Sequence, residues 1–170
     1  MLGRPQQSEA ASYYFTYINK AEGEDPVALM EKQLPAALEL FAGITEKTSI
    51  HRYAPDKWTI RQVLNHVSDT ERAFTFRALW FARGFQAPLP GYDQNIGVAG
   101  ADANHVPWLD HVEEFRLVRL ATICLFKNFP RQAWSMTGIA DDKPFSVRAL
   151  AYIIPGHLAH HLQILNERYF

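Results

Sequence analysis

The sequence predicts an all-α protein, a single four-helix bundle domain covering residues 1–170. Three observations favour this class. Four long segments carry apolar residues at helical spacing, no segment has the alternation of a convincing strand, and 170 residues suit one domain. Each amphipathic helix has an apolar stripe that its neighbours must cover, so four of them in one domain predict a bundle.

The first two helices are delimited by their flanking residues. Asp25 followed by Pro26 is typical of an N-cap and a first helical position, which predicts a helix over residues 26–44. Thr59 can cap a second helix over residues 60–83, which Gly84 ends.

The remaining helices follow by the same reasoning. The third is expected over residues 108–129, before Pro130, and the fourth over residues 147–169 with Ser146 as N-cap. The segment SYYFTYINKA, residues 12–21, is expected to form a short helix that packs its aromatic side chains on the bundle.

The connection between the second and third helices predicts the topology. Residues 84–107 contain three prolines and four glycines, and the segment far exceeds the roughly 2 to 8 residues of usual helix–helix links. At about 3.3 Å per residue it can return along the whole second helix, about 37 Å long. We therefore expect an up-down-down-up bundle with a long crossover, in which the second and fourth helices are antiparallel.

Composition excludes several function classes. Lys and Arg number 17 against 18 Asp and Glu, which argues against nucleic-acid binding. The first twenty residues lack the apolar core of a signal peptide, and no apolar run approaches the roughly 18 residues that span a bilayer. The single Cys124 lies in an apolar stretch and is expected in the core. These features predict a soluble, unprocessed protein of the reducing cytoplasm, with no membrane role.

Seven histidines stand out, and two of them suggest a metal site. His157 and His161 are four residues apart, so they project from one face of the fourth helix, which is also its apolar face. Such a pair can bind one divalent ion through neutral nitrogens at about 2.0 to 2.1 Å. His66 in the second helix is a candidate third ligand.

The heights of these residues agree with the expected topology. His66 lies about 10 Å from the start of its helix, and the midpoint of the other two lies about 14 Å from the end of theirs. Antiparallel helices would thus place all three nearly level. The alternative is that these are hydrogen-bonded core or surface histidines. His51, His105, His111 and His160 are interpreted as surface residues without a functional role.

Several motifs together resemble the bacterial DinB-like superfamily. They are WTIRQVLNHVSDTERAF, a long loop containing LPGYDQN, EEFRLVR, and the ending SVRALAYIIPGHLAHHLQILNERY, so the resemblance covers nearly the whole chain. It implies an up-down-down-up bundle, usually a homodimer, with nickel, zinc or a similar divalent ion. Carried over by position, the ligands are His66, His157 and His161.

The resemblance also implies a range of activities. Relatives include thiol-dependent S-transferases and a mycothiol-dependent isomerase, so the expected activity is hydrolysis or S-transfer on a small substrate, with metal-activated water or a low-molecular-weight thiol as nucleophile. The alternative is a non-catalytic, metal-binding or stress-linked dimeric bundle.

Residues around the predicted ligands have two interpretations. Asp69 and Glu71 could orient a ligand or act as acid and base, or could be solvated charges on a helix face. Trp58, Tyr92 and Asp93 could line the mouth of a pocket if the crossover folds over it, although Trp58 also suits a core position. Residues 84–107 would then set specificity, but no motif in them names a substrate.

Overall fold

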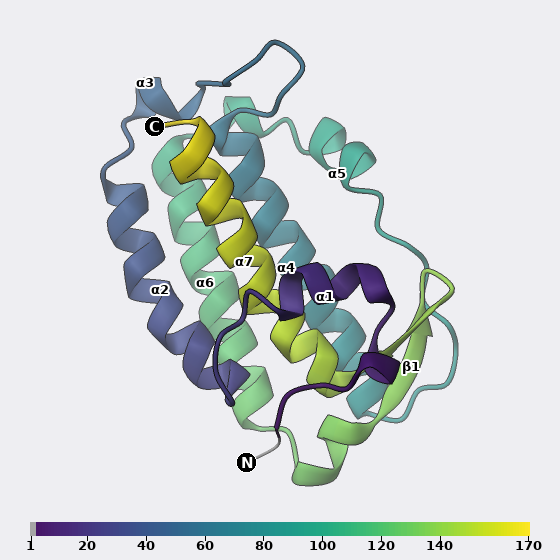
Figure 1. Cartoon of the computed structure of the whole chain (residues 1–170). Coiled ribbons are helices and arrows are strands. Elements are labelled where there is room, and N and C mark those ends of the chain that lie inside the picture. Colours follow the sequence, from purple (N-terminus) through teal and green to yellow (C-terminus); the bar gives the residue numbers. More distant parts are fainter. Residues whose placement is uncertain (1–2) are drawn as a thin grey trace.

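The computed structural model describes residues 3–170 and consists mainly of four long helices (Figure 1). Their bounds are α2 Pro26–Ala42, α4 Ile60–Ala82, α6 Trp108–Lys127 and α7 Val147–Arg168. Shorter helices are α1 Phe15–Ile18, α3 Glu46–Ser49 and α5 Gln94–Ala101, and 3₁₀ turns cover Gln7–Glu9, Ser12–Tyr14, Ala103–His105 and Arg131–Ser135. The four predicted helices are confirmed to within two residues at each end.

Capping explains why the helices begin at these residues. The Asp25 carboxylate accepts hydrogen bonds from the amides of Val27 and Ala28 at the start of α2. Thr59 forms a capping box with Gln62 at the start of α4, and Ser146 accepts from the Ala149 amide in α7. These bonds satisfy amides that have no partner within the helix.

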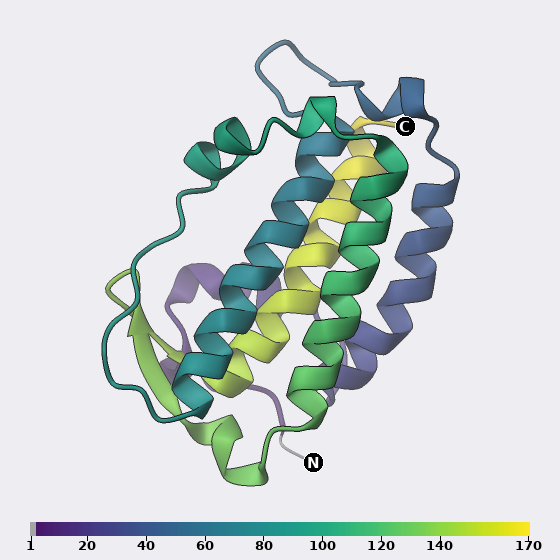
Figure 2. The ribbon, with the colours of Figure 1, turned by 180° about the vertical axis from the view of Figure 1, so that it is seen from behind.

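The bundle has the predicted up-down-down-up order. In Figure 1 α2 and α7 run upward while α4 and α6 run downward, and Figure 2 shows the crossover returning along the back of the molecule. The crossover contains α5 and a 3₁₀ turn, which the sequence interpretation treated as loop. As a result α4 packs antiparallel to α7 and parallel to α6.

The core consists of two apolar clusters stacked along the bundle axis. One contains Phe74 of α4 and Ile154 of α7, and the other contains Leu64 of α4 and Leu158 of α7. The two clusters meet where α4 and α7 carry the predicted ligand histidines. A polar centre at this level is therefore enclosed by apolar packing above and below.

The sequence analysis expected no strands, and this expectation was wrong. Strands β1 Thr137–Ala140 and β2 Lys143–Ser146 form an antiparallel hairpin. Asp141 and Asp142, both at φ 55°, form its two-residue turn, as type I′ turns require. The hairpin packs on α4 so closely that a Cβ on Gly138 would lie 2.1 Å from the Phe81 ring.

Two single-residue expectations were also wrong. Cys124 is exposed, because the core side of α6 is formed by residues such as Phe115, Ile123 and Phe126, and Cys124 lies on another side of the helix. His111 is buried, because it shares the core side with Phe115, where its ring nitrogen Nε2 lies 2.8 Å from the Ala103 carbonyl oxygen.

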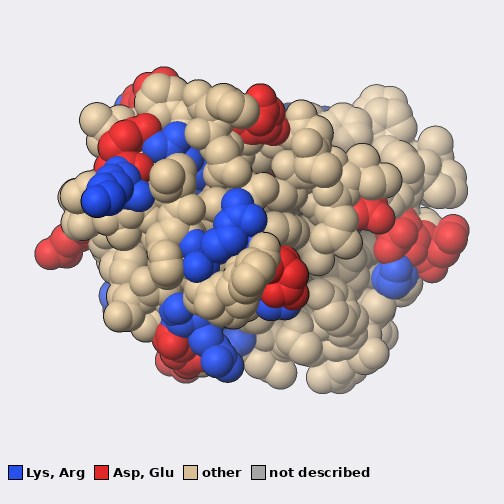
Figure 3. Space-filling model, turned by 90° about the horizontal axis from the view of Figure 1, so that it is seen from above, with Lys and Arg blue, Asp and Glu red and all other residues tan. Residues whose placement is uncertain are grey.

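The surface carries charges of both signs. On the face seen from above, Lys and Arg lie beside Asp and Glu (Figure 3). Among the described residues, no helix is long and apolar enough to cross a membrane.

Candidate metal centre

Three histidines from two helices converge at the junction of the two apolar clusters. His66 projects from α4, and His157 and His161 project from consecutive turns of α7. The Nε2 atom of His157 lies 3.2 Å from Nε2 of His66 and 3.1 Å from Nε2 of His161. The structure therefore brings the three predicted ligands together, with their ligand atoms all within 4.8 Å of one another.

These separations suit a shared metal ion. Two nitrogens bound to one ion at 2.0 to 2.1 Å, at angles between 90° and 109°, are roughly 2.8 to 3.4 Å apart. The two Nε2–Nε2 distances to His157 fall in this range, and the ligand atoms of His66 and His161 lie within 4.8 Å of each other. Because imidazole nitrogen is a preferred ligand of zinc and nickel, the residues present fit a divalent ion of that type.

Burial keeps these histidines in the neutral form that binds metal. Their exposed fractions are 2% for His66, 5% for His157 and 9% for His161. Burial, with a smaller contribution from neighbouring histidines, lowers the pKa of His66 to about 4 and that of His161 to about 3. Burial likewise lowers the pKa of His157 well below its ordinary value. At neutral pH none of them must lose a proton before binding a cation.

Neighbouring side chains hold the histidine rings in place. The Thr70 hydroxyl, one turn after His66, lies 3.2 Å from Nδ1 of that ring. Trp58 is half-buried, and its ring lies 5.0 Å from the His66 ring. The Trp58 carbonyl accepts a hydrogen bond from the Tyr169 hydroxyl at 2.7 Å. Hydrogen bonding to the second ring nitrogen is the usual way in which a ligand histidine is oriented.

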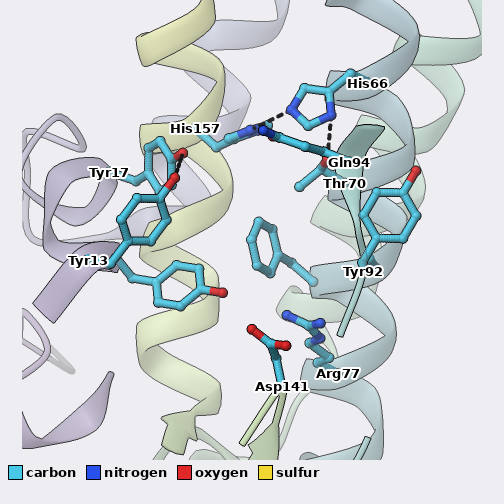
Figure 4. Close-up of a pocket in the computed structure, with 12 residues that line it drawn as sticks. Tyr13, Tyr17, His66, Thr70, Arg77, Tyr92, Gln94, Asp141 and His157 are labelled. Atoms are coloured by element: carbon cyan, nitrogen blue, oxygen red, sulfur yellow. Dashed lines mark hydrogen bonds between the residues drawn. The ribbon is translucent and has the colours of Figure 1, made fainter. Parts of the chain in front are cut away.

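A pocket of about 190 Å³ opens beside the histidines (Figure 4). His66 and His157 form one end, and Arg77 and Asp141 lie toward the other. Its lining residues are Tyr13, Tyr14, Tyr17, His66, Thr70, Ala73, Phe74, Arg77, Tyr92, Gln94, Asp141 and His157. The tyrosines at positions 13 to 17 come from the short helical segment that the sequence predicted to pack its aromatics on the bundle.

The third histidine faces a different depression. His161 lines a hollow of about 280 Å³ together with Trp58 and Tyr169, near the end of the bundle where the chain terminates. Two separate pockets therefore border the cluster.

The two candidate acid–base residues have different surroundings. Glu71 is 2% exposed, and both of its carboxylate oxygens accept hydrogen bonds from Arg119 of α6. Asp69 is half-buried and accepts a hydrogen bond from Arg72 at 3.0 Å. Burial raises the pKa of Asp69. Neither side chain lines the pocket.

The other singled-out residues are distributed around the site. Tyr92 lines the pocket, whereas Asp93 caps α5 by accepting from the Asn95 and Ile96 amides. The His160 ring is half-buried, 5.1 Å from the His161 ring, but its nitrogens do not belong to the three-histidine cluster.

Sequence reasoning missed Thr70 and Arg77 as pocket residues. Both follow His66 at helical spacing, four and eleven residues later, so they lie on the same side of α4. That periodicity was available in the sequence. The position of Asp141 at the pocket could not be predicted in this way, because it depends on the hairpin.

The fold and the cluster define a class of protein: an up-down-down-up helical bundle with three histidines converging between its second and fourth long helices. The sequence model of the DinB superfamily matches residues 29–165, and the chain belongs to this superfamily.

One similar solved structure is YfiT from Bacillus subtilis, described as a probable metal-dependent hydrolase with an unusual four-helix bundle topology. The TM-score is 0.72 at 16% sequence identity, and the match covers 96% of this chain and 89% of that one. At this identity the likeness concerns the fold. No curated protein sequence matches the chain.

Proposed function

We propose that the protein is a metal-dependent enzyme in which His66, His157 and His161 hold a divalent ion and a small substrate reacts in the adjoining pocket. The observation that carries this proposal is the convergence of three buried histidines, with Nε2–Nε2 distances of 3.1 and 3.2 Å, two of which, His66 and His157, form one end of that pocket. The chemistry supplied by such an ion is Lewis-acid activation of water or of a low-molecular-weight thiol. Hydrolysis and S-transfer are the reactions that this supports.

The protein's own residues bind and orient in this mechanism. Thr70 fixes the His66 ring through Nδ1, and Phe74 keeps the wall beside His157 apolar, with ring centroids 6.2 Å apart. Tyr17 packs edge-on against His157 at 5.2 Å and hydrogen-bonds to Tyr13 at 2.8 Å. Because Glu71 is fully engaged with buried Arg119, half-buried Asp69, which pairs only with the exposed Arg72, is the acidic candidate with more freedom to exchange protons.

Location and assembly complete the proposal. We infer a cytoplasmic protein, since the exposed thiol of Cys124 suits a reducing compartment.

We also infer a homodimer. Phe76 and Phe85 are half exposed and pack with Trp80 on the outside of α4, forming an aromatic surface that a second copy can cover. Light scattering coupled to size-exclusion chromatography measures the assembly directly.

Metal content tests the site. Protein purified without a histidine tag should contain close to one divalent ion per chain by elemental analysis, and zinc or nickel should raise the melting temperature of chelator-treated protein. His157→Ala should abolish metal retention, because it removes the central nitrogen of the three. His160→Ala, the matched control on the same helix, should leave retention nearly intact. Equal losses from the two variants would mean that the ligand set is wrong.

Activity separates an enzyme from a binding protein. Metal-loaded protein should catalyse hydrolysis of activated esters or amides, or transfer of a small thiol to an electrophile, and a chelator should abolish the reaction. Stoichiometric metal without turnover across such a panel would favour the non-catalytic bundle.

A further inference from the structure

Three arginines are buried among the described residues, and one of them differs from the other two. Arg61 and Arg119 each form an ion pair, with Glu46 and Glu71 respectively. Arg77 is 5% exposed, as buried as Arg61. Among the described residues, however, no carboxylate oxygen lies within 4.0 Å of its guanidinium nitrogens, so it has no ion pair. The nearest acidic residue of the pocket, Asp141, pairs instead with Lys143.

The surroundings of Arg77 orient its guanidinium without forming an ion pair with it, although Asp141, whose pKa is lowered mainly by Lys143 and to a smaller degree by Arg77, is a nearby negative charge. One nitrogen donates to the Pro90 carbonyl at 3.2 Å, and the group lies 5.7 and 5.8 Å from the centroids of the Phe74 and Phe145 rings. Burial raises the pKa of Tyr14, and the nearby Arg77 guanidinium opposes that change. Arg77 is therefore held by a carbonyl and aromatic faces at the wall of the pocket that ends at His66 and His157 (Figure 4).

A buried cation without a paired anion is unfavourable unless a ligand supplies the missing charge. A guanidinium presents paired N–H donors that match the two oxygens of a carboxylate. From this geometry we propose that Arg77, with the Tyr14 hydroxyl beside it, binds the carboxylate of a small organic acid whose other end reaches the histidine cluster. This rests on the proposed function, because it names the substrate class of the same pocket.

The pocket also limits which anion and what size of molecule fit. Asp141 lines the same end, and its negative charge would repel a phosphate dianion more than a singly charged carboxylate. The Phe74 ring lies between the two ends of the pocket, near the His157 ring and the Arg77 guanidinium. In the bound acid, an apolar spacer should therefore separate the carboxylate from the reacting group. The pocket volume of about 190 Å³ is below the roughly 300 to 1,000 Å³ of sites for drug-sized ligands. The acid should therefore be a small molecule.

Binding of acids and their amides to metal-free protein tests the proposal without turnover. Isothermal titration at pH 7.5 would compare butyrate, benzoate, phenylacetate and 3-phenylpropionate with the corresponding amides, using chelator-treated protein so that no carboxylate can bind a metal. At least one acid should bind 10-fold or more tightly than its amide. Arg77→Met should remove this preference, and Arg77→Lys should keep part of it.

Two further variants make the result specific. Arg83→Met removes an exposed arginine at the end of the same helix and should keep the preference. Asp141→Asn should strengthen acid binding by removing the nearby negative charge. If no acid exceeds its amide in the wild-type protein, or if Arg77→Met keeps the preference, the proposal is overturned. The metal content of the same protein before chelator treatment reports separately on the histidine site, so the two failures are distinguishable.

Discussion

At the scale of single residues, the site depends on how each histidine ring is turned. An imidazole can present either nitrogen to an ion, and the hydrogen bond at the other nitrogen decides which one is free. At His66 the Thr70 hydroxyl lies 3.2 Å from Nδ1, which leaves Nε2 directed at His157. Thr70 is thus a positioning residue for the ligand His66.

Replacing Thr70 tests this role. Thr70→Val keeps the shape of the side chain but removes the hydroxyl, so metal affinity should fall about 10- to 100-fold, as is usual when a partner of a ligand histidine is lost. Competition titration with a chromophoric chelator measures the change. Thr75→Val on the same helix, whose hydroxyl pairs with Thr122 at 3.2 Å, is the matched control and should leave the affinity unchanged. Similar affinities for both variants would remove Thr70 from the site.

Sequence reasoning succeeded for the residues that sit at regular spacing on long helices. His157 and His161 were identifiable because four residues make about one helical turn. Arg77 was not identified, because its importance lies in lacking a carboxylate partner, and pairing across helices is invisible in one sequence. His111 and Cys124 were misplaced because α6 is apolar on more than one side, so composition alone did not define its core face.

At the scale of elements, α1 can pack against α7 beside the site because α7 has a glycine, Gly156, at the point of contact. A Cβ on Gly156 would lie 2.0 Å from the Tyr17 carbonyl oxygen, which means that the α1 backbone rests directly on α7. This contact places the Tyr17 ring 5.2 Å from the His157 ring and forms the tyrosine side of the pocket. Gly156 therefore couples the N-terminal segment to the histidine cluster.

Adding a methyl group at this position should separate the two elements. Gly156→Ala should lower the free energy of unfolding by about 1 to 3 kcal/mol, since the backbone of α1 must move to relieve the overlap. Gly100→Ala in α5, where a Cβ would meet nothing within 4 Å, should instead be neutral or stabilise by up to about 1 kcal/mol. Urea unfolding measures both. A neutral Gly156→Ala would show that α1 does not pack as closely as described.

The elements differ in how far they could be predicted. Helices with a capping residue at the start, such as Asp25, Thr59 and Ser146, were located closely because caps are local chemistry. The hairpin was missed because its strands have four residues each and its turn uses two aspartates rather than the more diagnostic Asn-Gly. Its stability comes from packing on α4, which is a tertiary effect.

At the scale of the whole molecule, the length of one connection determined where the histidines meet. A short link would make α4 and α6 antiparallel, whereas the crossover makes them parallel and leaves α7 antiparallel to α4. His66 and the α7 histidines then lie at one level. The topology was predictable because it depends on chain length and helix rise, which a sequence provides directly.

The four helices are also joined by one polar network, which is buried at Glu71 and Arg119 and partly buried at Gln33. Arg119 of α6 binds Glu71 of α4 through three hydrogen bonds and reaches Gln33 of α2 at 3.3 Å, while Gln33 donates to the Pro155 carbonyl of α7 at 3.0 Å. The Pro155 carbonyl lies two residues before the central ligand histidine. A charge left unpaired in this network would therefore be costly to the whole bundle.

Glu71 is accordingly expected to act on stability rather than on chemistry. Glu71→Gln should lower the free energy of unfolding by about 3 to 5 kcal/mol, because it leaves the Arg119 charge buried without its partner. The Glu71→Met/Arg119→Met double variant should recover much of this loss, since no buried charge then remains. Glu114→Gln breaks a surface pair with Arg72 between the same two helices and should cost no more than about 1 kcal/mol. A Glu71→Gln variant that keeps its stability and its metal but loses turnover would instead assign Glu71 to acid–base chemistry.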